Sequence, residues 1–255
     1  MDDQSGEFVQ SLARGLTIIR AFDVENPELS LSDVARRTGF PRAAARRFLH
    51  TLVTLGYMRT DGRVFALTPR VLELGFSYLS ALSLPEVAQP HLERLSHDVG
   101  ESVSAAVLDG TDIVYVARVP TRRIMSVRIT IGTRFPAAAT SMGRVLLASL
   151  PADERARALD DAELVAHTDR TLIDRGLLDD ELDHVRERGW ALVDGELEAG
   201  LRSVAAPLHS RDGRVVAAIN ISSSATRDTL EHLRDAYVPR LLDTARGIDA
   251  DLGLV

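Results

Sequence analysis

Residues 30–67 read SLSDVARRTGFPRAAARRFLHTLVTLGYMRTDGRVFAL, and this stretch decides the expected fold of the first part of the chain. Ser30 can cap a helix that runs to residue 38, and Asp33 stands at the third helical position in a variant of the capping box. Gly39 suits the left-handed conformation that ends a helix. The stretch is therefore expected to begin with a short helix followed by a tight turn.

A second helix, begun by Pro41 and expected to end near residue 55, carries the basic side chains. Its apolar stripe, at i, i+3, i+4 and i+7 spacing, consists of Ala45, Phe48, Leu49, Leu52 and Leu55. Off this stripe lie the residues that we expect to contact DNA: Arg42, Ala43, Arg46, Arg47 and His50. Two short helices joined by a glycine turn, with arginines on the second, are typical of a helix-turn-helix that places its second helix in the major groove.

A β-hairpin is predicted directly after the basic helix. Asp61-Gly62 separates two short β-prone runs, and this dipeptide is a strong signal for a hairpin turn. A hairpin in this position is a wing, and we expect Arg59 and Arg63 beside its tip to touch phosphate or the minor groove. With an upstream helix capped by Ser11, residues 1–68 are predicted to form a winged helix-turn-helix domain.

The basic residues are concentrated in this part of the chain. Residues 31–70 hold eight arginines and two acids, a net charge of +6, whereas the whole chain carries −7. A basic segment in an acidic chain favours a polyanion as its partner. We therefore expect this domain to bind double-stranded DNA.

Composition excludes several classes of protein. The 255 residues contain no cysteine, so disulfides, cysteine nucleophiles and thiolate metal sites are ruled out. No apolar run approaches the ~20 residues of a membrane helix, and the acidic N-terminus does not have the order of a secretory signal. The histidines lack the spacing of a zinc site on a helix. We expect a cytoplasmic protein with no membrane association, no metal and no other cofactor.

The second part of the chain, residues 84–255, alternates strands with helices. Strands are expected over residues 102–108, 113–119, 124–129, 190–193, 202–208 and 215–221. Helices are expected over residues 84–97, 143–149, 174–188 and 226–252, with a further one from Pro151. This order predicts an α+β domain with a mostly antiparallel sheet of about six strands and flanking helices. Residues 69–83 are expected to form a connector helix between the two domains.

No catalytic motif is recognisable in the second domain. It contains no GxSxG, P-loop or GxGxxG sequence. Residues 134–144, RFPAAATSMGR, instead place small and hydroxyl residues directly before the start of a predicted helix. The free backbone amides at such a helix start attract an anion. A carboxylate ligand would favour a bidentate arginine, and those near this region in sequence are Arg118, Arg122, Arg123 and Arg134. A plain capping turn and surface salt bridges are the alternative interpretation.

The order of these pieces resembles the IclR family of bacterial regulators over nearly the whole chain. The stretches that carry the resemblance are residues 11–16, 31–39, 52–57 and 136–148, and ELEAGLRSVAAP at residues 196–207. FVQSLARGLTIIRAF, RVPTRRIMSV and GTRFPAAATSMGRVLLA further resemble the Pca/Pob branch, which controls protocatechuate and hydroxybenzoate breakdown. The resemblance implies a GAF-like effector domain that binds a small carboxylate, such as an aromatic acid or β-ketoadipate. It also implies dimers built through the DNA-binding domains, and often tetramers built through the effector domains.

The resemblance also implies where the effector binds. By matching motifs, and with the arginine considered above, the effector-binding residues are expected to be Ser141, Met142, Gly143, Asp194, Ser203, Asn220, Ser222 and Arg134. Val193 stands where the family motif prefers an acid, so Asp194 is the nearest candidate for that position. Ala138 stands where this branch commonly has an aromatic residue, which would widen the pocket and suit a different ligand.

Other functions fit parts of the pattern. A GAF-like domain can serve as the active site of an enzyme, and a basic helix can bind an acidic protein instead of DNA. A regulator of an unrelated pathway with a different effector is a further alternative. The favoured expectation is a regulator, not an enzyme, whose dimer binds an operator with two half-sites and responds to a small carboxylate.

Overall fold

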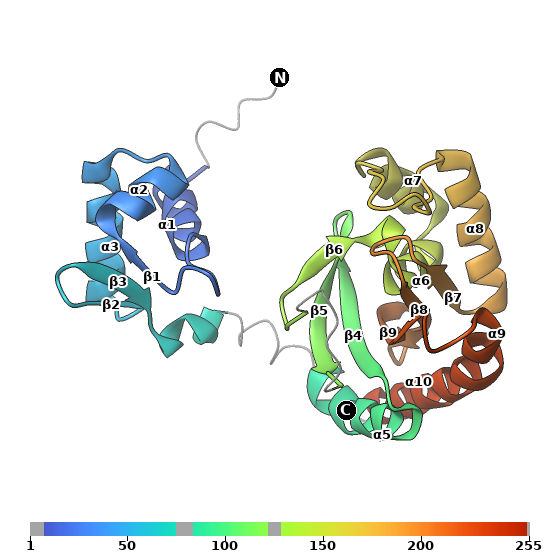
Figure 1. The fold of residues 1–255 in the computed structure, drawn as a ribbon. Helices are drawn as coiled ribbons and strands as arrows, with labels where there is room; N and C mark the ends of the chain where they lie inside the picture. Colours follow the sequence, from blue (N-terminus) through green and yellow to red (C-terminus); the bar gives the residue numbers. More distant parts are fainter. Residues whose placement is uncertain (1–7, 75–83, 122–128, 254–255) are drawn as a thin grey trace. The chain divides into compact units, whose positions relative to one another are not determined.

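The computed structural model describes residues 8–74, 84–121 and 129–253, and the chain divides into two compact units, Met1–Ala81 and Leu82–Val255 (Figure 1). Each unit is described by itself. The expected connector, residues 69–83, begins with a 3₁₀ turn at Pro69–Val71, and its residues 75–83 lie outside the described part of the chain.

The first unit combines helices with a three-stranded antiparallel sheet. Its elements in chain order are α1 (Gln10–Arg20), β1 (Glu28–Ser30), α2 (Leu31–Thr38), α3 (Arg42–Thr54), β2 (Met58–Thr60) and β3 (Val64–Leu67). The strand order is β1-β3-β2, so Phe65 of β3 lies between Leu29 and Thr60. This arrangement confirms the winged helix-turn-helix, and β1 is a strand that the sequence did not predict.

Local signals explain why α2 begins and ends where it does. The Ser30 hydroxyl oxygen accepts the Asp33 backbone N–H at 3.3 Å, and the Asp33 carboxylate accepts the Ser30 backbone N–H at 3.3 Å. This reciprocal pair satisfies two of the unpaired N–H groups at the helix start. Gly39 has a φ of 70°, so it ends the helix in the left-handed conformation that only glycine adopts without strain.

The hairpin turn is held by one carboxylate. Asp61 accepts the backbone N–H groups of Arg63 and Val64 at 2.8 and 2.9 Å, and these donors hold the pKa of Asp61 below its usual range, with Val64 contributing most. Gly62 has a φ of 91°, which a side chain would disfavour. The Asp-Gly signal therefore predicted the wing through the contacts that form it.

The apolar sides of the three helices meet the sheet in a small core. Its fully buried side chains include Ile18, Val34, Ala45 and Leu49. Leu55, which was expected to extend the apolar stripe of α3, lies beyond the helix end and is 51% exposed. Ser11 is not a cap either, because α1 begins after Val9 and has no side-chain capping bond.

The second unit is built on a six-stranded antiparallel sheet with strand order β6-β5-β4-β9-β8-β7. The strands are β4 (Ser102–Asp109), β5 (Asp112–Val119), β6 (Arg134–Pro136), β7 (Ala191–Asp194), β8 (Leu201–His209) and β9 (Val215–Ser224). The helices are α5 (Leu84–Val99), α6 (Ser141–Ser149), α7 (Ala152–Asp160), α8 (Arg175–Arg188), α9 (Leu230–His232) and α10 (Val238–Leu252), with a 3₁₀ turn at Ala137–Ala139. The expected α+β domain with about six strands is confirmed.

One expectation for this unit stays untested and another needs correction. The strand expected over residues 124–129 lies outside the described part of the chain except for Ile129, which is not in a strand. Within the described residues, the strand that follows β5 is β6, which the sequence did not predict. The final helix begins at Leu230, after the Thr229 cap, and not at residue 226, and a π-helical turn at Leu233–Tyr237 lies between α9 and α10.

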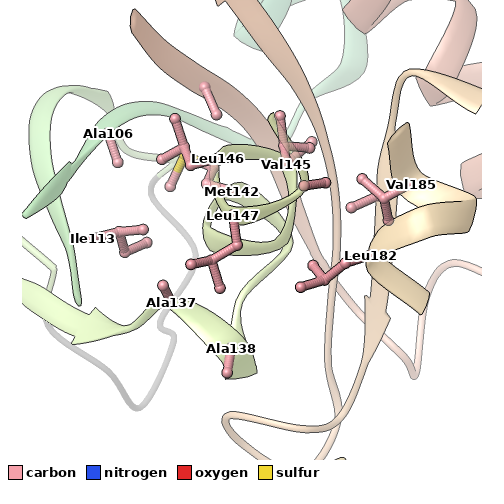
Figure 2. Close-up of a cluster of buried hydrophobic side chains, with 14 of the residues drawn as sticks. Ala106, Ile113, Ala137, Ala138, Met142, Val145, Leu146, Leu147, Leu182 and Val185 are labelled. Carbon is pink, nitrogen blue, oxygen red and sulfur yellow. The ribbon is translucent and has the colours of Figure 1, made fainter. Parts of the chain in front are cut away.

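Helices cover both faces of this sheet. α5 and α10 pack on one face, and α6 packs on the other with α8 behind it (Figure 1). Met142, Leu146 and Leu147 of α6 lie between Ile113 of the sheet and Leu182 of α8 (Figure 2). Burying such a side chain stabilises the fold by about 1.5–3 kcal/mol. The start of α6 is therefore fixed against the sheet, where the candidate pocket was expected.

Candidate functional sites

The basic surface of the first unit lies on α3. The helix buries Ala45, Leu49 and Leu52, and its other side is exposed. The five residues of this helix expected to contact DNA are all on that exposed side: Arg42, Ala43, Arg46, Arg47 and His50. His50 also packs edge-on against the Phe65 ring of the wing, with centroids 6.0 Å apart. The geometry therefore presents this surface outward, as a helix that enters a DNA groove requires.

The positive charge of this surface is largely uncompensated. Within the described residues, Arg42, Arg46, Arg47 and Arg63 have no carboxylate partner, and all four are exposed. Arg59 of the wing is also exposed but pairs with Glu28 at 2.9 Å. Unpaired guanidinium groups attract phosphate over several ångströms, and no internal ion pair has to break first.

The second unit contains a narrow cavity between the sheet and the start of α6. Residues from four strands, α6 and two loops line it: Tyr115, Ile129, Ala139, Thr140, Ser141, Met142, Val193, Leu197, Leu201, Ser203, Asn220 and Ser222. The free space is about 20 Å³, the room of roughly one water molecule. Apolar side chains form most of the walls, and the polar ones converge on the sheet.

Polar side chains on neighbouring strands form the floor of this cavity. The Ser141 hydroxyl donates to the Ser203 hydroxyl oxygen at 2.8 Å, and the Asn220 amide donates to the Ser222 hydroxyl oxygen at 2.9 Å. Ser203 pairs with Ser222 across β8 and β9, so both pairs lie on the same face. Asn220 is only 3% exposed, and its amide oxygen has no hydrogen-bond partner in the described structure. A buried polar atom without a partner is costly, and a ligand or water that supplies a donor removes this cost.

Five of the eight residues expected to bind an effector line the cavity together: Ser141, Met142, Ser203, Asn220 and Ser222. Gly143 does not line it. Its backbone N–H donates to the Thr140 hydroxyl oxygen at 3.0 Å, and a Cβ at this position would lie 2.1 Å from the Ala137 carbonyl oxygen. Gly143 therefore allows α6 to approach the preceding turn, and its amide is not available to a ligand.

Asp194 and Arg134 lie outside the cavity. Asp194 pairs with Arg202 at 2.6 Å and with Arg170, and the hydrogen bond from Arg202 is the main cause that lowers its pKa. Arg134 on β6 pairs with Asp109 at 2.5 Å and Asp112 at 3.1 Å. Both side chains are already engaged in ion pairs elsewhere in the unit.

The alanine expected to widen the pocket lies elsewhere as well. Ala138 packs in the cluster around α6 and is not part of the cavity wall, whereas its neighbour Ala139 is. Any widening of the cavity therefore has to come from other positions.

Sequence reasoning missed several lining residues, most notably Tyr115 and Thr140. Tyr115 is 4% exposed, and burial raises its pKa to about 12. Its place in the cavity depends on a β-bulge in β4–β5 pairing, where Ala105 pairs with Ala117 but Ala106 pairs with Tyr115. Such a bulge has no signature in this sequence. The hydroxyl residues before the helix did indicate Thr140 or Ser141 as the cap of α6, and the cap is Thr140, but a capping role does not by itself place Thr140 in a cavity wall.

A winged helix-turn-helix joined to an α+β unit with a buried polar cavity defines a DNA-binding regulator that responds to a small molecule. Family models agree with this class: the IclR helix-turn-helix domain matches residues 11–62, and the bacterial transcriptional regulator IclR C-terminal model matches residues 76–250. The chain belongs to the IclR family of transcriptional regulators.

Individual relatives are similar over nearly the whole chain. A Pca regulon regulatory protein from Pseudomonas putida is 44% identical over 95% of this chain and 84% of its own length. The crystal structure of a putative transcriptional regulator from Rhodococcus sp. RHA1 is 58% identical, with a TM-score of 0.88 over 97% of this chain and 99% of its own. An IclR homologue from Microbacterium hydrocarbonoxydans, crystallised with 4-hydroxybenzoate, is 28% identical, with a TM-score of 0.86 over 96% and 100% of the two chains.

These relatives are regulators of transcription, so the chain is a regulator and not an enzyme. Within the described residues, no helix has the length and apolar character needed to span a bilayer. That part of the chain also holds no cluster of His, Cys, Asp and Glu side chains suited to a metal ion.

Proposed function

We propose that this regulator binds operator DNA in the cytoplasm through α3 and the wing, and that a small carboxylate in the cavity of the second unit, such as an aromatic acid or β-ketoadipate, modulates its affinity. The DNA-contacting residues in this proposal are those on the exposed side of α3 and beside the hairpin tip: Arg42, Ala43, Arg46, Arg47, His50, Arg59 and Arg63. The effector-contacting residues are Ser141, Met142, Ser203, Asn220 and Ser222.

The observation that carries the effector assignment is the polar floor inside an otherwise apolar cavity. Ligand sites of this kind use apolar walls for affinity and a few converging polar groups for orientation. A hydroxybenzoate has an apolar ring with polar groups at its ends, which suits apolar walls above serine and asparagine side chains. The Microbacterium relative was crystallised with 4-hydroxybenzoate, which supports the same chemical class here.

The small volume of the cavity implies that effector binding changes the conformation of the second unit. A free space of about 20 Å³ is too small for a benzoate ring, so the effector must move lining elements apart when it binds. Because Ser141 lies at the start of α6 and Ser203 lies on β8, separating these residues shifts a helix against the sheet. The effector then biases operator binding by its differential affinity for the two shapes, typically ~1–3 kcal/mol.

A homodimer would present two basic helices to the DNA. In the first unit, Phe8, Leu12 and Leu16 recur every fourth residue and are 68%, 63% and 47% exposed. Leu12 and Leu16 of α1, with Phe8 just before the helix, form an exposed apolar stripe that is suited to a second copy of the unit. The dimer would then read an operator with two half-sites ~34 Å apart or a multiple of this distance, and effector units could join two dimers into a tetramer.

A thermal-shift assay combined with a gel shift on DNA from upstream of the gene tests the proposed effector class. The candidates are 4-hydroxybenzoate, protocatechuate and β-ketoadipate. A bound effector at a hundredfold excess over its Kd stabilises the protein by ~2.7 kcal/mol, and it should also change the mobility shift. Bulky substitutions, Ser203→Phe and Asn220→Leu, should abolish the effector response while DNA binding persists. A normal response in both variants would refute the assignment of this cavity.

A further inference from the structure

Arg118 on β5 has an unusual environment for an arginine of this unit. It is partly buried, and its Nη1 donates to the Ser104 hydroxyl oxygen at 3.1 Å. Its Nε is buried with no hydrogen-bond partner, and within the described residues no carboxylate pairs with it. Burial lowers the pKa of Arg118, which reflects a cation removed from water without a compensating anion. By contrast, the buried Arg144 pairs with Glu196 at 2.6 Å.

The β-bulge turns Arg118 toward the cavity side of the sheet. Ser104 pairs with Arg118 and Ala106 pairs with Tyr115, and residues directly opposite on paired strands share a face. Ser104 and Ala106 are two residues apart, so they also share a face. Tyr115 and Arg118, three apart in sequence, therefore lie on one face, although a regular strand would place them on opposite faces.

The same row of the sheet leads from Arg118 to the cavity floor. Ser104 pairs with Arg118 on one side and with Asn220 on the other. Adjacent strands are about 4.8 Å apart, so the arginine backbone lies about 10 Å from that of Asn220, and its side chain already covers the distance to Ser104. Asn220 lines the cavity, whereas Arg118 and Ser104 lie beyond its present wall, so an acid bound in the cavity reaches Arg118 by extending along this row.

Two unpaired polar groups thus lie in one row of the sheet, two strands apart. The guanidinium offers a positive charge and a free N–H, and Asn220, which lines the cavity, has an unpaired amide oxygen. The amide can rotate so that either its oxygen or its nitrogen is the unpaired atom, and it can thus meet a ligand hydroxyl in either orientation.

We propose that Arg118 recognises the carboxylate of the effector and that Asn220 contacts the polar group at the opposite end of the ring. The inference rests on the proposed function and makes Arg118 the residue that selects acids over neutral analogues. A guanidinium binds a carboxylate through two parallel hydrogen bonds, and this geometry discriminates strongly against an amide.

Calorimetry with 4-hydroxybenzoate and the neutral 4-hydroxybenzamide tests the inference on the full-length protein. The wild type should bind the acid about 10- to 100-fold more tightly than the amide, the ratio expected for a charge-assisted pair. Arg118→Gln should weaken the binding of the acid and so reduce this ratio to about threefold or less. Arg118→Lys should retain part of it, because lysine keeps the charge without the planar fork. The matched control is Arg134→Gln, which removes an arginine of the same sheet that already pairs with Asp109, and it should leave the ratio unchanged.

Retention of the wild-type ratio by Arg118→Gln would overturn the inference. A second measurement does not depend on the folding of a variant: the Nε–H signal of Arg118 in the wild type should shift downfield with saturating acid and not with the amide. An unmoved signal in the presence of bound acid would also overturn it. If none of 4-hydroxybenzoate, protocatechuate and β-ketoadipate binds the wild type, the proposed effector class itself fails, and that outcome is distinct from acid binding that does not depend on Arg118.

Discussion

At the scale of single residues, Gly143 shows how closely α6 approaches the turn before it. A Cβ there would lie 2.1 Å from the Ala137 carbonyl oxygen and 2.3 Å from its Cα, and neither backbone atom can move without displacing the turn. The same turn leads into Ala139 and Thr140, which line the cavity. Gly143 therefore determines the position of the cavity wall without contacting a ligand.

Gly143→Ala should lower the free energy of unfolding by about 1–3 kcal/mol, because overpacking a buried site displaces its neighbours. Chemical denaturation followed by circular dichroism measures this change. The control is Gly176→Ala on α8, whose Cβ would meet only a side-chain oxygen of Asp174 at 3.3 Å, so its effect should stay within about 0.5 kcal/mol. Equal stability of the two variants would contradict the close approach.

At the scale of elements, one buried ion pair ties α6 to the loop between β7 and β8. Arg144 of α6 is 3% exposed, donates to Glu196 at 2.6 Å, and also donates to the Ala138 carbonyl oxygen at 3.0 Å. Glu196 additionally accepts the Leu172 backbone N–H at 2.9 Å. The pair thus joins α6, the loop between β7 and β8, and the segment at Leu172.

Removing one partner of this pair should be worse than removing both. Arg144→Met leaves Glu196 charged and buried, and should cost about 3–5 kcal/mol of unfolding free energy. The double variant Arg144→Met with Glu196→Gln removes both charges and should recover part of this loss. Urea unfolding of the wild type, both single variants and the double variant forms a double-mutant cycle. Strictly additive effects would show that the two side chains do not interact.

Elements with strong local signals were predictable from the sequence, and those that depend on distant pairing were not. The capping box at Ser30 and the Asp-Gly turn at Asp61 act through residues close to them in sequence. For this reason α2 and the wing were predicted from the sequence alone. β6 is only three residues long and exists because it pairs with β5 across a long connection. Tyr115 reached the cavity through a bulge that periodicity cannot reveal.

In the candidate site, too, some residues were predicted from the sequence and others were not. Ser141, Ser203 and Asn220 were placed by motif resemblance and do meet in one cavity. Gly143 and Asp194 belong to the same motifs, yet a motif does not say which members contact a ligand and which support the fold. That distinction requires the close approach to Ala137 and the ion pair with Arg202, which only the structure provides.

At the scale of the whole molecule, the proposed dimer determines how the protein reads DNA. A single basic helix contacts only one half-site, whereas two helices related by a two-fold axis contact two, and the operator must match their spacing. The apolar stripe of α1 is the surface in the first unit to which we assign this contact.

Leu12→Glu combined with Leu16→Glu should convert the dimer to a monomer or to a dimer of effector units alone, because buried like charges oppose association. Light scattering measures the mass, and gel shifts should show weaker operator binding. Val24→Glu is the matched control, since Val24 is 73% exposed in the same unit and lies outside the stripe. An unchanged mass together with unchanged operator affinity in the double variant would refute the assignment.

The most direct test is a fluorescence-anisotropy titration of DNA from upstream of the gene, at moderate salt with competitor DNA, with and without 4-hydroxybenzoate. We expect specific binding that the acid changes by about 5- to 150-fold. The Arg46→Ala and Arg47→Ala double variant should bind at least tenfold more weakly with a shallower salt dependence, while Arg157→Ala, which removes an exposed arginine of the other unit, should bind normally. Operator affinity that neither the acid nor the loss of Arg46 and Arg47 alters would contradict the proposed function.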